Sequence, residues 1–170
     1  MIMNIPKEIM DKFGGKDKQD HVGKNFQNQP YRSGKKGVQV EQPTKTTEIV
    51  FRTNGQLRRA LLTSDAENWS NLLYDNGYGV TPTALRNFYN EVKALQSRIQ
   101  AGGFQSNEAM IGLLKSKAAY AYARAENKKK TGFGHLKSMI EQGSDLSKSE
   151  SDFNDFALFF EAVMGFFKGR

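Results

Sequence analysis

Two stretches of the sequence carry basic side chains at spacings that place them on one face of a helix. In the first, a helix expected to begin at Pro82, Arg86 and Lys93 lie seven residues apart, close to two helical turns. In the second, from about Ser106 to Asn127, the basic residues are spaced by seven and four, and a short lysine run extends the row. Arginine binds phosphate oxygens in a bidentate manner, and lysine adds charge with little geometric demand. We therefore define a basic surface of residues predicted to bind a nucleic-acid backbone: Arg86, Lys93, Lys117, Arg124, Lys128, Lys129 and Lys130.

Polar and aromatic side chains border these rows. Asn90 and Ser97 lie beside the first row, and Tyr120 lies beside the second. Amide and tyrosine groups can contact sugars or stack on bases. No residue pattern indicates base reading in a groove, so we expect backbone binding with little sequence preference. Two other interpretations stay open at this point: the solvated outer faces of an ordinary bundle, and a helical protein-interaction module that docks acidic partners.

The segments that carry these basic residues are predicted to be helices. Thr81-Pro82 predicts a helix start, and Gly102-Gly103 predicts its end. Capping boxes at residues 64–67 and 147–150 predict two further helix starts, and a short helix should end at Gly143. Apolar residues recur at helical spacing: Trp69, Leu72 and Leu73; Leu85, Phe88, Tyr89, Val92, Leu95 and Ile99; Met110, Leu114, Ala118, Ala121 and Ala125; Leu136, Met139 and Ile140. The sequence thus predicts an all-α, compact bundle of about five helices over residues 54–170.

The last helix carries Phe153, Phe156, Phe160 and Val163 on one stripe and further apolar residues on much of the remaining face. A helix of this kind needs cover on more than one side. It is either the central core helix, or part of it contacts another subunit.

Residues 1–53 are predicted to be a flexible, basic N-terminal extension. Residues 14–46 are rich in Gly, Lys, Gln, Asn and Asp and hold few large apolar groups. Ile5, Ile9 and Phe13 would share one side of a short amphipathic segment, and residues 46–51 have the composition of a strand. The extension could be an RNA-binding arm or a docking segment.

The residues that would support catalysis or metal binding are scarce. There are no cysteines, and the only histidines, His21 and His135, lack metal-ligand spacing. No phosphate-binding loop or dinucleotide fingerprint is present, and Asp152 and Asp155 are placed on the outer side of the last helix. We therefore expect no enzyme activity, no catalytic residue, no metal and no cofactor. An unrecognised hydrolase would require a cleft with converging acids.

Net charge and the absence of a signal-peptide pattern indicate where in the cell the protein is expected. The net charge is +7, which attracts polyanions. The N-terminus lacks the pattern of a signal peptide, and no stretch approaches the roughly 20 apolar residues that cross a bilayer. We expect a cytoplasmic protein with no membrane partner.

Three blocks of sequence, in this order and spacing, resemble the small subunit of type III-A CRISPR effector complexes, the Csm complexes. The first is residues 80–92, a Thr-led helix with Leu85-Arg86. The second is residues 113–124, which end in Ala123-Arg124, and the third is the Phe-rich segment 153–168. The resemblance covers about residues 62–168. No single block is specific, whereas all three in order are fairly specific. The predicted extension is longer than the family pattern.

The resemblance implies a compact helical bundle that catalyses nothing. Copies of such a subunit stack along the complex, parallel to the backbone subunits that hold the guide RNA, and contact the backbone of the guide RNA–target RNA duplex in antiviral defence. Target cleavage belongs to the backbone subunits, and DNA cleavage and cyclic-oligoadenylate synthesis belong to the large subunit. The implied partners are both RNA strands, neighbouring copies of the chain and these other subunits. By position, the family arginines correspond to Arg86 and Arg124.

Overall fold

The computed structural model describes residues 48–167. Within them the chain forms five α-helices, preceded by one short hairpin. The helices are α1 (Ser64–Tyr74), α2 (Pro82–Gly102), α3 (Phe104–Arg124), α4 (Lys130–Leu146) and α5 (Glu150–Phe166). The predicted all-α class with about five helices is confirmed.

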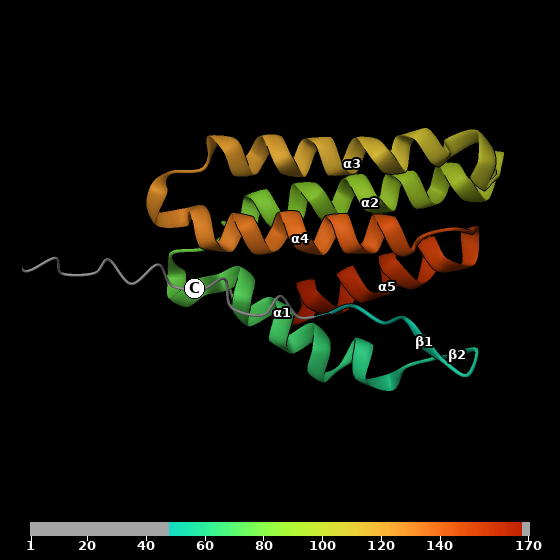
Figure 1. Ribbon diagram of the computed structural model, residues 1–170, viewed down its shortest axis with the longest axis horizontal. Coiled ribbons are helices and arrows are strands. Elements are labelled where there is room, and N and C mark those ends of the chain that lie inside the picture. Colours follow the sequence, from blue (N-terminus) through green and yellow to red (C-terminus); the bar gives the residue numbers. More distant parts are fainter. Residues whose placement is uncertain (1–47, 168–170) are drawn as a thin grey trace, which may run out of the picture. The chain divides into compact units, whose positions relative to one another are not determined.

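The helices pack in layers around α5. Figure 1 shows α2 and α4 lying between α3 and α5, and α1 packing against α4 and α5 on the side away from α3. The α2–α3 and α4–α5 turns lie at one end of the bundle, and the α1–α2 and α3–α4 connections lie at the other (Figure 1). This arrangement makes α2 and α3 an antiparallel pair, which is the pair that carries most of the basic surface.

The side chains of α5 form the centre of the core. Phe153, Phe156, Phe159, Phe160 and Val163 are fully buried. Their burial confirms the interpretation of α5 as the core helix, because α1, α2 and α4 cover it on several sides. A contact of α5 with another subunit stays a prediction.

The placement of Asp155 on the outer side of the last helix was wrong. Asp155 is buried, and its Oδ2 lies 2.6 Å from the Nε of Arg52 in an ion pair. Asp152 instead acts at the helix start, where its Oδ2 accepts hydrogen bonds from the backbone N–H of Lys148 and the hydroxyl of Ser149. The two acids therefore have structural partners and do not converge on a cleft.

The start of α2 follows the prediction. Thr81 is the N-cap, its Oγ1 accepts a hydrogen bond from the N–H of Ala84 at 3.2 Å, and Pro82 is the first helical residue. The helix ends at Gly102, and the C-cap residue Gly103 has a φ of 82°, a conformation that favours glycine. The tight turn there sends α3 back along α2.

The two predicted capping boxes were misplaced by one or two residues. Thr63 rather than Ser64 is the N-cap of α1, and no side chain caps that end. The N-cap of α5 is Ser149, which accepts a hydrogen bond from the N–H of Asp152. A serine does cap α5, but Ser147 with Glu150 and Ser149 with Asp152 have the same spacing. The sequence alone therefore does not show which serine is the N-cap.

The predicted bounds and faces of α3 and α4 also needed correction. α3 starts at Phe104 and ends at Arg124, and it buries Ile111 while Met110 remains exposed. α4 begins at Lys130 and continues through Gly143 to Leu146. Gly143 does not end the helix. Its missing side chain makes room for the ring of Phe156, which a Cβ would approach to 2.1 Å.

Residues 48–51 of the predicted strand at 46–51 form no strand, and a short hairpin follows them at residues 52–57. Strands β1 (Arg52–Thr53) and β2 (Gln56–Leu57) pair antiparallel, with Thr53 opposite Gln56. Asn54 and Gly55 form the two-residue loop, both with positive φ. Asn-Gly is a strong hairpin signal, and the prediction overlooked it.

Residues just before the hairpin pack on the bundle. Ile49 and Phe51 are buried, and the N–H of Ile49 donates to Oε1 of Gln142 in α4 at 2.9 Å. The predicted domain boundary after residue 53 stays a prediction, but the last part of the predicted extension contributes to the core. Residues 1–47, with the predicted segment of Ile5, Ile9 and Phe13, lie outside the described residues. Across residues 48–167, no helix has the length and apolar character needed to span a membrane.

Candidate nucleic-acid interface

Arg86 and Arg124 lie near the same end of the antiparallel α2–α3 pair. Arg86 is in the second turn of α2 and Arg124 is the last residue of α3, so both are remote from the turn at Gly103. Both side chains are exposed. Neither makes an ion pair with a carboxylate among residues 48–167. These two arginines are therefore available to an anionic ligand.

The guanidinium of Arg124 is held by a neighbouring aromatic ring. Its Nη1 donates to the hydroxyl of Tyr120 at 2.6 Å, and its Cζ lies 5.4 Å from the centre of that ring. Tyr120 is 62% exposed. The ring restricts the rotamers of the arginine without neutralising it, which lowers the entropy lost when a phosphate binds.

Two lysines of the basic surface are paired across helices. Nζ of Lys93 lies 3.5 Å from Glu161 of α5, and Nζ of Lys117 donates to Glu91 of α2 at 2.8 Å. Ion pairs as exposed as these contribute about 0 to 1 kcal/mol. A phosphate can therefore compete for either lysine at little cost in folding free energy.

The lysines of the α3–α4 connection differ in their partners. Lys128 and Lys129 both lie within 3.5 Å of Glu126, and the two lysines hold the pKa of that exposed carboxyl below its usual range, chiefly through the hydrogen bond with Lys128. Nζ of Lys130 donates to the carbonyls of Tyr122 and Ala123 at 2.7 and 2.9 Å. Lys130 thus caps the C-terminal end of α3, because it donates to carbonyl groups that have no partner within the helix.

The two rows of basic residues border the outer face of α2 on opposite sides: the first row belongs to α2, and the second belongs to α3. Lys93 points to α5, and Arg86, seven residues earlier, projects within about 20° of it. Lys117 and Arg124 follow the edge of α3 that borders α2, since Lys117 reaches Glu91. Between the two rows lies the outer face of α2, and Glu91 is the only acidic residue of that helix. A polyanion lying on this face would have cations on both sides.

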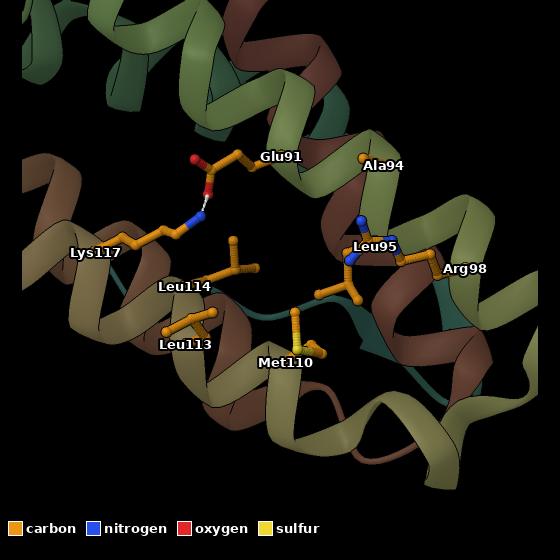
Figure 2. A pocket seen from close by; sticks show the side chains of 8 residues that line it. All are labelled: Glu91, Ala94, Leu95, Arg98, Met110, Leu113, Leu114 and Lys117. Carbon is orange, nitrogen blue, oxygen red and sulfur yellow. Dashed lines mark hydrogen bonds and ion pairs between the residues drawn. The ribbon is translucent and has the colours of Figure 1, made fainter.

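A groove between α2 and α3 adds a cation that sequence reasoning missed. Figure 2 shows Leu95, Met110 and Leu114 lining a hollow between α2 and α3, with Lys117 and Arg98 at its rim. The volume of this hollow is about 120 Å³. Arg98 is exposed, and its guanidinium has no carboxylate partner among the described residues. Arg98 lies seven residues after Glu91 and therefore on the same α3 edge of α2, but no sequence signal pointed to it, because only the structure shows that Glu91 faces α3.

The two histidines add no site in the described part of the chain. His135 is half-buried in α4, and burial lowers its pKa, opposed by the nearby charge of Asp75. His21 lies outside the described residues. Within residues 48–167, no three His, Asp or Glu side chains gather where they could hold a metal ion.

Comparison with known proteins identifies a family. A family model described as Csm2 Type III-A matches residues 56–169, more than half of the chain. The match spans all five helices and all seven residues of the basic surface. No curated protein and no solved structure matches the chain significantly.

Proposed function

The chain belongs to the Csm2 family and is a small subunit of a type III-A CRISPR complex, and from this premise we propose that α2 and α3 bind the backbone of the guide RNA–target RNA duplex. The proposed subunit is non-catalytic and works in the cytoplasm, in antiviral defence. Copies of it stack beside the backbone and large subunits of the complex, along the duplex.

One observation carries this proposal. The two arginines whose positions match the family pattern, Arg86 and Arg124, lie on neighbouring helices at the same end of the bundle, with no carboxylate partner among the described residues. An acid three or four residues away on the same helix would stabilise an arginine on a solvated face, and no acidic residue has that spacing from Arg86 or Arg124. Two arginines without carboxylate partners at the same end of the basic surface, one on each of its two rows, favour a phosphate ligand.

The test replaces both arginines by neutral residues. Arg86→Gln with Arg124→Gln is expected to weaken binding of an RNA duplex, because two phosphate contacts are lost. The slope of log affinity against log salt concentration should shrink by about 2. Fluorescence anisotropy of a labelled duplex, titrated at several salt concentrations, measures both quantities.

A matched control separates local contacts from overall charge. Arg59 and Lys148 are exposed and lie on other elements, so Arg59→Gln with Lys148→Gln removes the same charge elsewhere on the surface. This control should keep most of the wild-type slope. Equal losses in the two double variants would reject a defined RNA surface on α2 and α3.

The alternative function is a protein-interaction module whose basic rows dock acidic partners. It predicts that the wild-type chain binds neither duplex nor single-stranded RNA in a gel-shift assay. Co-purification of guide RNA with the tagged chain would contradict it.

A further inference from the structure

A cavity of about 270 Å³ lies where the end of α3 meets the starts of α2 and α4. Its polar lining includes Arg124, Lys129 and Glu126, and its apolar lining consists of Ala121, Ala125 and Phe133. Sites for drug-sized molecules measure about 300–1,000 Å³, so this cavity suits one smaller group. It opens beside the predicted basic surface and is separate from the α2–α3 groove.

Small residues create the hollow and rigid contacts keep its walls in place. Ala121 and Ala125 leave space on the inner side of the last turn of α3. The start of α4 rests directly on the loop before α2, because a Cβ at Gly132 would lie 2.5 Å from the Cα of Gly79. The cavity is therefore formed before any ligand arrives, which lowers the entropic cost of binding.

The charges of the cavity favour an anionic group at its rim. Arg124 and Lys129 contribute two positive charges and Glu126 one negative charge, which also faces Lys128. Phe133 and the alanines offer an apolar surface to a flat ring below that rim. A free phosphate would use the cations but leave the apolar lining empty.

We propose that this cavity receives a single unpaired nucleotide of the bound RNA, with its base against Phe133 and its phosphate at Arg124 and Lys129. This inference rests on the proposed RNA binding and adds a site to it. A paired base cannot enter, because it stays stacked inside the duplex. The site distinguishes RNA with an extruded base from RNA that is fully paired, and it does so through the base as well as the backbone.

The test fills the cavity without changing any charge. Ala121→Leu places a larger side chain in the hollow, whereas Ala123→Leu, two residues along the same helix, makes the same change at an exposed position. The probes are two RNA duplexes of one sequence, one fully paired and one with a single bulged 2-aminopurine. Anisotropy gives the affinities of the full-length chain, and 2-aminopurine fluorescence reports burial of the base.

The wild-type chain is expected to bind the bulged duplex about tenfold more tightly than the paired one. Ala121→Leu should abolish the preference for the bulged duplex and leave the affinity for the paired duplex unchanged. Ala123→Leu should keep the preference for the bulged duplex. Circular dichroism and thermal unfolding check that each variant folds, and Ala125→Leu serves as a second filling variant.

Two results would overturn the inference and leave RNA binding intact. In the first, the wild-type chain binds the paired and the bulged duplex with equal affinity, and both affinities fall as salt rises. The other is a bulge preference that survives both filling variants. Failure of the wild-type chain to bind either duplex would instead reject the proposed function, and the inference with it.

Discussion

Replacing Gly143 by alanine is expected to destabilise the bundle by about 1–3 kcal/mol, although alanine is the better helix former. Gly143 lies in α4 where the ring of Phe156 packs against the helix backbone. A Cβ at this position would lie 2.1 to 2.7 Å from three ring carbons. Phe156 is fully buried, so its ring has no open space to move into. Urea unfolding followed by circular dichroism measures the change.

A second glycine provides the control for this substitution. Gly112 lies on the exposed side of α3, and a Cβ there meets nothing within 4 Å. Gly112→Ala should therefore stabilise the chain by about 0.5–1 kcal/mol. In a double-mutant cycle, Phe156→Leu should cost less in the Gly143→Ala background than in the wild-type chain. Additive effects would show that the ring and the glycine are not in direct contact.

Phe51→Ala is expected to lower the free energy of unfolding by about 3–5 kcal/mol. Phe51 precedes the hairpin and was predicted to belong to a flexible extension, yet its side chain is 6% exposed within the core. Its carbonyl accepts a hydrogen bond from the N–H of Arg58 at 3.0 Å, which closes the hairpin. Loss of the ring leaves a cavity that the rigid helices cannot fill.

The neighbouring valine is the matched control. Val50 is 39% exposed, so Val50→Ala removes little buried surface and should cost less than about 1 kcal/mol. Chemical denaturation of both variants at the same pH gives the comparison. Similar costs at the two positions would mean that residues before β1 are not part of the folded unit.

The candidate interface was partly predictable from sequence. Heptad spacing placed Arg86 with Lys93, and the ion pair of Lys93 with Glu161 shows which edge of α2 they share. The pattern gave no information about partners on other helices. It did not reveal that Glu91 pairs with Lys117, or that Lys130 is engaged by the carbonyls of α3.

Residues with two plausible roles were the ones misjudged. Asp155 follows a polar pattern on α5, but Arg52, from a segment 103 residues earlier, supplies the cation that stabilises its buried carboxylate. Met110 and Ile111 are equally apolar neighbours, and only the packing of α2 and α4 against α3 decides that Ile111 points inward.

The all-α class, the start of α2 and the apolar stripes of α2 and α5 could be predicted without the structure, because capping and hydrophobic periodicity depend on interactions within one helix. The excess of positive charge follows directly from composition. The packing of the bundle, in contrast, established that Ile49 and Phe51 belong to the core, why Gly132 and Gly143 must lack side chains, and which basic residues have a carboxylate partner. Those properties arise between segments distant in sequence, where steric fit and the nearest opposite charge are set by the packing of the whole bundle.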